Sequence, residues 1–182
     1  MPDFEIEYEY AGPPRIRIES ALVPGPTGRP YRHHRLRAGD GGVVIVAQNL
    51  DAVLFVRVRR VAADDEIFLE LPRGWTDTVD RGSATAAAVR ELQEETGMRP
   101  VSARRVGAYV VDSSIYPADV AVVHCVTETR LPSGQTDGET EPGTIWVPAD
   151  DVGDLILRGE VRDAHSLAAL AVWHSWCGRR EL

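Results

Sequence analysis

The run from Arg90 to Met98 constrains this 182-residue chain more than any other stretch, because it gathers three glutamates within one helical turn. Glu91, Glu94 and Glu95 are spaced so that a helix would place them on one face. Like charges at these spacings repel and destabilise a bare helix. The run is therefore either a solvated, glutamate-rich helix end or a set of hard oxygen ligands for Mg²⁺ or Mn²⁺.

The residues around this run predict a strand, a loop and a helix. Residues 69–74 form a short apolar segment that a Pro-Arg-Gly turn interrupts. Ser83 is a good N-cap for a helix over residues 84–96, and Gly97 follows it where a left-handed conformation costs least. The glutamates thus belong to the C-terminal half of a helix that follows a strand-breaking turn.

This arrangement resembles the Nudix box, whose pattern is G-x5-E-x7-R-E-U-x-E-E-x-G-U, with U a bulky aliphatic residue. The second half matches at every specified position of residues 90–98. In the first half, the glutamate of the pattern falls on Gly82 and its glycine on Thr76, whereas the glycine of the turn is Gly74. We interpret this as a loop two residues longer than usual that lacks the family's first glutamate.

In the family, that glutamate pairs with the arginine of the box and braces the loop. We predict that Asp80 or Asp77, in the same loop, pairs with Arg90 instead. The departure then concerns the rigidity of the loop more than the binding of metal.

The flanking sequences are similar to the ADP-ribose pyrophosphatase branch of the Nudix hydrolases, in residues 53–60 and 158–164 and in a strand-rich N-terminus. The resemblance implies an α+β protein with the Nudix fold, an α/β/α sandwich with a mixed sheet, plus a small N-terminal antiparallel sheet. It also implies a homodimer in which both subunits line the substrate pocket. We expect a dimerising N-terminal β-sheet subdomain over residues 1–40 and a Nudix hydrolase domain over residues 41–182.

The same resemblance implies divalent-metal-dependent hydrolysis of the pyrophosphate bond of ADP-ribose or a related nucleoside diphosphate sugar. It assigns metal binding to Glu91 and Glu95, with Glu94 as a further ligand or a brace. A backbone carbonyl of Arg73 or Gly74 would complete the ligand shell. Mg²⁺ or Mn²⁺ is the expected cofactor.

The general base of this branch is a carboxylate on a flexible loop before the last strand. Here the loop contains Asp137, Glu139 and Glu141. We expect Glu139 to be the base, with Glu141 as the second candidate. The alternative is an acidic loop that is merely solvated.

Arginines and aromatic rings are candidates for substrate binding. Arg57, Arg60 and Arg73 could bind phosphate or ribose, because guanidinium groups form forked hydrogen bonds with oxyanions. An aromatic ring is expected to stack on adenine. The candidates for this ring are Tyr31, Tyr116 and Trp75. Surface arginines and core aromatics are the alternatives for each residue.

Alternating apolar residues predict a strand over residues 3–10 with one buried face, formed by Phe4, Ile6, Tyr8 and Tyr10. Further strands are expected over residues 15–23, 31–37, 43–47, 52–59, 68–71, 104–112, 119–128 and 144–147. Helices are expected over residues 150–158 and 163–177, the second with Leu167, Leu170, Ala171 and His174 on one face.

Composition narrows the function classes. The net charge of −8 argues against general nucleic-acid binding. Cys125 and Cys177 are far apart in the sequence and are expected to be free thiols. The chain has no apolar run that could span a membrane and no signal-peptide core, so we expect a cytoplasmic protein.

Two other functions compete with the leading one. A catalytically weak Nudix fold could act as a nucleotide-binding sensor or partner module, as Gly82 in place of glutamate suggests. A triphosphate-cleaning enzyme is disfavoured, because such enzymes usually need no N-terminal sheet.

Overall fold

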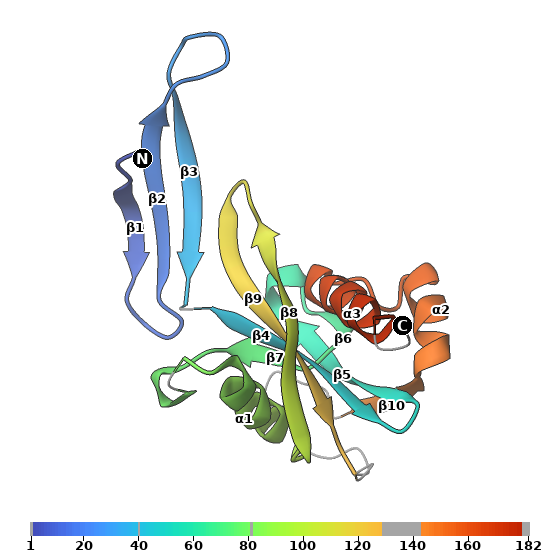
Figure 1. Cartoon of the computed structure of the whole chain (residues 1–182). Coiled ribbons are helices and arrows are strands. Elements are labelled where there is room, and N and C mark those ends of the chain that lie inside the picture. The colour runs from blue at the N-terminus through green and yellow to red at the C-terminus, as the bar shows by residue number, and fades with distance from the viewer. Residues whose placement is uncertain (1, 40, 81, 129–142, 180–182) are drawn as a thin grey trace.

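The computed structural model describes residues 2–39, 41–80, 82–128 and 143–179. Within them lie a three-stranded antiparallel sheet and a seven-stranded mixed sheet with helices on both faces (Figure 1). This confirms the expected α+β class and the separate N-terminal sheet.

The small sheet projects from the body of the molecule (Figure 1). Its strands pair antiparallel in chain order and are β1 (Glu5–Tyr10), β2 (Ile16–Val23) and β3 (Tyr31–Ala38). Ion pairs of 2.7 Å from Arg17 to Glu9 and 2.6 Å from Arg35 to Glu19 cross between strands. These pairs and the backbone ladder hold the strands in register.

The prediction of a buried face on the first strand is wrong. Ile6, Tyr8 and Tyr10 are about half exposed, at 52%, 54% and 49%. The apolar residues alternate in the sequence, but the register shifts between Ile6 and Tyr8, which pairs Ile6 with Glu19 and Tyr8 with Ile18 and so places them on opposite faces of the small sheet. All the residues of β1 are exposed in the single chain.

The large sheet has the strand order β10-β5-β4-β9-β8, with β6 paired to β5 and β7 paired to β4. The pair β4–β9 is parallel and the other pairs are antiparallel. The strands are β4 (Gly42–Asn49), β5 (Ala52–Arg60), β6 (Glu66–Glu70), β7 (Arg73–Trp75), β8 (Ser102–Asp112), β9 (Tyr116–Val126) and β10 (Thr144–Pro148). The short strand β7 was not predicted, because it follows directly on the strand-breaking Pro72.

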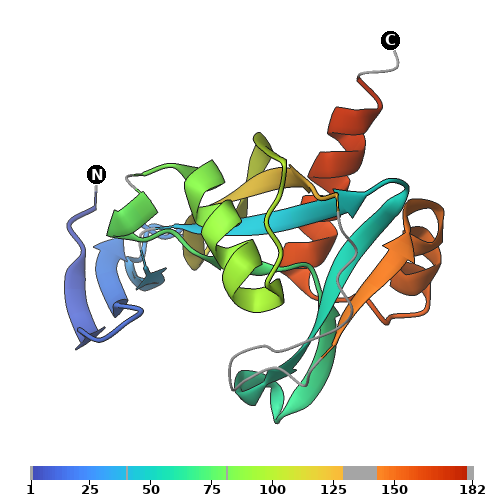
Figure 2. The same ribbon diagram turned by 90° about the horizontal axis from the view of Figure 1, so that it is seen from below.

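Helix α1 (Ala84–Thr96) covers one face of this sheet, and α2 (Val152–Leu157) and α3 (Ala164–Cys177) cover the other (Figures 1 and 2). Alternate residues of β4 explain the two layers. Val43 and Ile45 pack in the cluster that contains α1, whereas Val44 and Val46 pack in the cluster that contains α3. A strand buried on both faces reads as a continuous apolar run, as residues 43–47 do.

The predicted face of the last helix is only partly correct. The buried residues of α3 are Ser166, Ala169, Leu170 and Trp173, whereas Ala171 and His174 are exposed. The helix is apolar around most of its circumference, so spacing alone did not select the face that meets the sheet. Neither Cys125 nor Cys177 forms a disulfide among the described residues, in agreement with the prediction. None of the helices in the described ranges is long and apolar enough to cross a membrane.

Candidate active site

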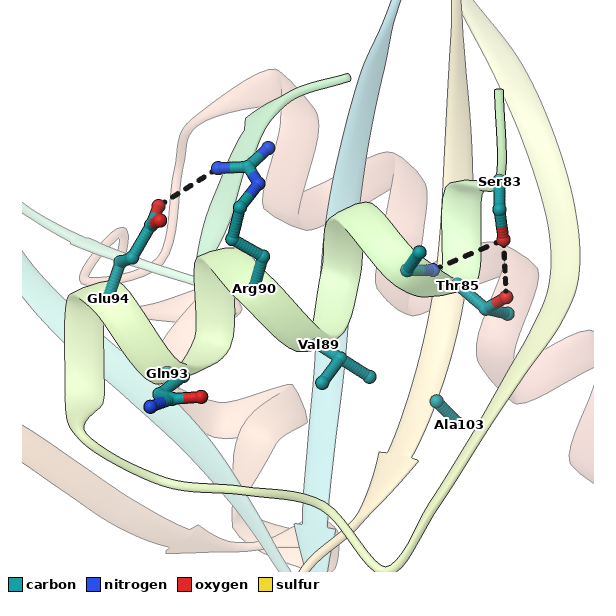
Figure 3. Close-up of a pocket in the computed structure, with 8 residues that line it drawn as sticks. Ser83, Thr85, Val89, Arg90, Gln93, Glu94 and Ala103 are labelled. Atoms are coloured by element: carbon teal, nitrogen blue, oxygen red, sulfur yellow. Dashed lines mark hydrogen bonds and ion pairs between the residues drawn. The ribbon is translucent and has the colours of Figure 1, made fainter. Parts of the chain in front are cut away.

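Helix α1 begins and ends at the two residues that the sequence predicts. The hydroxyl of Ser83 accepts a hydrogen bond from the backbone N–H of Ala86 at 3.2 Å (Figure 3). Gly97 adopts a left-handed conformation with φ of 72°, and its N–H donates to the carbonyl of Gln93 at 2.8 Å. Both ends of the helix that carries the glutamates are therefore fixed.

Arg90 joins the helix to the loop before it. Its Nε and Nη2 donate to the two carboxylate oxygens of Asp80 at 3.2 and 3.0 Å, and Nη2 also donates to the carbonyl of Trp75 at 2.9 Å. The hydrogen bond from Arg90 holds the pKa of Asp80, which is 4% exposed, below its usual value. The predicted pairing of Arg90 with Asp80 is confirmed.

The loop is braced although the family's glutamate is missing. Asp80 also accepts a hydrogen bond from the backbone N–H of Asp77 at 2.7 Å. Gly82, which stands where the family has that glutamate, lies in the left-handed region with φ of 74°. Such a conformation favours glycine, so the local backbone and the residue type agree.

The three glutamates of α1 lie in different environments. Arg90 donates from Nη1 to Glu91 and to Glu94, each at 2.9 Å, and the Glu94 carboxylate is half exposed on the outer side of the helix (Figure 3). Glu95 accepts a hydrogen bond of 3.3 Å from the backbone N–H of Arg73. Among the described residues, no group of three or more His, Cys, Asp and Glu side chains converges on one point.

Burial perturbs the two inner carboxylates. It raises the pKa of Glu95 to about 7 and also raises the pKa of Glu91. A Cβ on Gly74 would lie 1.9 Å from Cδ of Glu91, so this carboxylate rests directly against bare backbone. Two desolvated carboxylates beside a glycine backbone are a donor set that suits a hard divalent cation, which would favour their charged forms.

A cavity of about 460 Å³ opens beside Glu91. It brings together six residues from four parts of the fold: Arg60, Arg73, Gly74, Trp75, Tyr116 and Glu91. All six are residues that the sequence singles out for metal or substrate binding. Leu36 and Ala38 at the end of β3 also line the cavity, so the small sheet forms part of its rim.

Other predicted residues lie elsewhere. Arg57 lines a separate groove of about 470 Å³ beside β10 and α2, and Tyr31 lies at the start of β3 with its ring centroid 6.3 Å from that of His33. Neither residue lines the cavity. Glu139 and Glu141, the candidates for the general base, lie outside the described residues.

Glu70 is a site residue that the sequence analysis missed. Its carboxylate is 1% exposed and accepts hydrogen bonds from Arg60 Nε at 2.9 Å and Arg73 Nε at 3.0 Å. Burial tends to raise the pKa of Glu70, but the two arginines outweigh it and lower the pKa below the usual value. A lone glutamate within the apolar strand of residues 67–71 was the signal that could have revealed it.

A shallower hollow of about 770 Å³ lies on the other side of α1, where Arg90 and Glu94 meet Val89, Gln93 and Ala103 (Figure 3). Its charged groups are already paired with each other. The inner cavity, with Glu91 and two arginines, is therefore the better candidate for chemistry on a charged substrate.

The pattern of the NUDIX domain matches residues 38–170 of the chain. The protein belongs to the Nudix family. Over 165 residues it is 31% identical to CMP-5'-(N-acetyl-N-hydroxy-3-aminopropyl)phosphonate hydrolase of Streptomyces rubellomurinus (strain ATCC 31215), covering 86% of this chain and 75% of that protein. Its fold is similar to a crystal structure of an ADP compounds hydrolase, with a TM-score of 0.76 and 20% identity over 99% of this chain and 97% of that one.

Membership of the Nudix family makes the chain a hydrolase of nucleotide-linked substrates, in a family that generally uses divalent metal ions. In this Nudix protein, the cavity beside α1 has one carboxylate of the box, Glu91, in its lining together with Arg60 and Arg73. The buried Glu70 accepts hydrogen bonds from both arginines.

Proposed function

We propose that this Nudix protein hydrolyses the pyrophosphate bond of ADP-ribose or a related nucleoside diphosphate sugar, with Mg²⁺ or Mn²⁺ as the cofactor. From ADP-ribose the products are AMP and ribose 5-phosphate. One observation carries the proposal: a single cavity contains Glu91 of the box and two arginines tied to the buried Glu70. It thus offers a site for metal next to a site for a diphosphate.

Glu91 and Glu95 are the residues that would hold the metal, with Glu94 and a carbonyl of Arg73 or Gly74 as further ligands. When bound, a divalent cation neutralises charge on the diphosphate and makes water a better nucleophile. Glu95 and Glu91 suit this role because burial raises the pKa values of both carboxyl groups. Their charged forms are the ones that a cation would stabilise.

The arginines orient the substrate. Arg60 and Arg73 line the cavity, and Glu70 fixes the guanidinium groups of both by hydrogen bonds. Preorganised donors of this kind bind phosphoryl oxygens without reordering at the moment of reaction. A carboxylate from Glu139 or Glu141 would accept the proton of the attacking water as the anhydride P–O bond breaks.

The nucleobase and the attached group could differ from those of ADP-ribose. The relative at 31% identity is named for hydrolysis of a CMP-linked phosphonate. A CMP-linked phosphonate is therefore a second candidate substrate. Its cleavage would use the same metal ligands and arginines, because both candidate substrates have an oxygen bridge between two phosphorus atoms as the bond to be cleaved.

The sensor alternative has lost part of its support. It was motivated by Gly82, yet Asp80 already pairs with Arg90 and braces the loop. Tight binding of ADP-ribose in calorimetry without any turnover would favour the sensor over the enzyme.

A substrate panel tests the proposal. Purified protein with Mg²⁺ or Mn²⁺ is incubated with ADP-ribose, NADH, sugar nucleotides, dNTPs and a CMP-linked phosphonate, and the products are identified by chromatography and mass spectrometry. We expect cleavage of a nucleoside diphosphate sugar at its pyrophosphate bond. Failure to hydrolyse any member of the panel would reject the proposed enzyme.

A further inference from the structure

A histidine that the box does not include also faces the cavity. His165 lies in the first turn of α3, and its ring lines the cavity together with Arg60, Arg73 and Glu91. Its backbone is well anchored, because Asp163 caps the helix at Ser166 N with a distance of 2.9 Å. The sequence analysis assigned no role to His165.

The hydrogen bond between His165 and Tyr109 engages one edge of the imidazole. The phenol oxygen of Tyr109 lies 2.6 Å from Nδ1 of His165. Among the residues that the structure describes, the side chains of Tyr109 and His165 form this hydrogen bond with each other and no other. The two ring nitrogens point in different directions, so Nε2 lies on the edge of the ring that Tyr109 does not engage.

The same contact bears on the tautomer of His165, because a phenol that donates to Nδ1 requires that nitrogen to be unprotonated. Burial raises the pKa of Tyr109 above its usual value, so the phenol keeps its proton. The 2.6 Å contact with Nδ1 of His165 fits a hydrogen bond in which this phenol is the donor. A neutral imidazole that accepts at Nδ1 carries its own proton at Nε2. The arrangement therefore presents a fixed N–H donor to the cavity without adding a charge.

The neighbours of His165 determine which acceptor this donor suits. Two guanidinium groups line the same cavity, and one buried carboxylate, Glu70, lies between them. This cluster of Arg60, Glu70 and Arg73 carries a net positive charge, which attracts an anion. An N–H donor beside it completes a binding site for an oxyanion better than for a neutral group.

We infer that His165 contacts the substrate directly and donates a hydrogen bond from Nε2 to an anionic phosphoryl oxygen of the nucleoside diphosphate. Tyr109 acts through it as a positioning residue that holds the ring and its tautomer. The inference rests on the proposed function, because it assigns one contact within that substrate site.

Three substitutions at position 165 separate a hydrogen bond from mere filling of space. In His165→Gln, the side-chain amide nitrogen reaches about as far as Nε2, whereas in His165→Asn it reaches only about as far as Nδ1. His165→Leu keeps much of the volume but has no donor. We expect KM for the nucleoside diphosphate sugar to rise about tenfold or more in the Leu and Asn variants, with a smaller change in kcat.

The Gln variant is expected to recover KM to within about threefold of wild type, because it restores the donor. A KM in the Leu variant equal to that of wild type, or a Gln variant as impaired as the Leu variant, would overturn the inference. Tyr109→Phe should raise KM by a smaller factor in the same direction, because it releases the ring without removing the donor.

A measurement of binding to the wild-type protein does not depend on turnover. In protein labelled with ¹⁵N-histidine, NMR is expected to show His165 as the Nε2–H tautomer; a folded His165→Gln variant is used only to assign the signal. Adding ADP should shift Nε2 more than Nδ1. An Nδ1–H tautomer, or no shift at saturating ADP, would reject the contact.

These two readouts distinguish the inference from the proposed function. If the panel shows no hydrolysis, the enzyme proposal fails while the NMR titration still reports on His165. If hydrolysis occurs but the substitutions at position 165 leave KM unchanged and ADP does not shift the NMR signal of His165, only the proposed contact is wrong. A shift with ADP-ribose but not with ADP would mean that His165 contacts the sugar, which also contradicts the phosphoryl assignment.

Discussion

At the scale of single residues, Glu95 combines a buried carboxylate with the spacing of a metal ligand. It lies one turn after Glu91 and accepts a hydrogen bond from the backbone of Arg73. Glu95→Gln keeps the size and an acceptor oxygen but removes the charge that a cation needs. We expect a folded variant whose kcat/KM with Mg²⁺ is lower by about a hundredfold or more.

Steady-state kinetics and circular dichroism measure the two halves of this prediction. Glu160→Gln is the matched control, because Glu160 is exposed and pairs only with the exposed Arg158 in the described structure. That control should retain wild-type kinetics. Wild-type activity in Glu95→Gln would count against its assignment as a metal ligand.

The same residue predicts how stability depends on pH. Burial raises the pKa of Glu95 from its usual 4.5 to about 7, so the folded state binds this proton more tightly than the unfolded state. The stabilisation is fully present below about pH 4.5 and is lost as the pH rises through about 7. Without metal, the free energy of unfolding of wild type relative to Glu95→Gln should fall by roughly 2–4 kcal/mol between pH 4.5 and 8.

Urea unfolding in EDTA at several pH values gives this difference, and the subtraction removes groups common to both proteins. Mg²⁺ at pH 8 should restore stability to wild type more than to the variant, because a cation favours the charged carboxylate. A difference that does not vary with pH would show that Glu95 ionises normally in the folded protein.

At the scale of elements, the loop between β7 and α1 departs from the family pattern without losing its brace. The backbone of Gly82 is in the left-handed region, with φ of 74°, and both carboxylate oxygens of Asp80 accept hydrogen bonds from Arg90. Gly82→Glu restores the residue of the pattern but forces a side chain into a conformation that glycine tolerates best. We expect the variant to be less stable by about 1 kcal/mol, with unchanged or lower activity.

Thermal and urea unfolding measure this cost, with Gly82→Ala as the control for backbone strain alone. If Glu at this position stabilised the protein or raised its rate, then Arg90 would lack a sufficient partner in Asp80.

Asp80→Asn is the complementary change and should destabilise the protein by roughly 2 kcal/mol, because the buried acceptor of the hydrogen bonds from Arg90 loses its negative charge.

The elements also show how far the sequence could predict the site. The sequence of residues 90–98 predicted helix α1, the positions of its glutamates and its end at a glycine, because these features depend on local spacing and capping. Glu70 and His165 could not be found in this way, since both depend on tertiary packing: Glu70 meets Arg60 and Arg73, and His165 reaches the cavity and Tyr109 from α3. The buried face of α3 was predicted only in part for the same reason. The helix is apolar on most sides, so packing against the sheet determines which side is buried.

At the scale of the whole molecule, the apolar face of the small sheet continues to the rim of the cavity. Cross-strand register aligns Tyr8 with Ile18 and Ile18 with Leu36, and Leu36 lines the cavity. Tyr8 and Ile18 remain 54% and 40% exposed in the single chain. A contiguous apolar face of this kind indicates an interface, and we predict that a second copy of the chain covers it to form a homodimer.

Light scattering with size-exclusion chromatography tests the dimer. Tyr8→Glu should weaken the dimer by about tenfold or more, because it introduces an unpaired charge into the interface. Leu157→Glu is the matched control, because Leu157 is 87% exposed on α2 and should leave the mass unchanged. Since the interface borders the cavity, loss of the dimer should also raise KM. A monomeric wild type at assay concentrations, with full activity, would show that the cavity is complete within one chain.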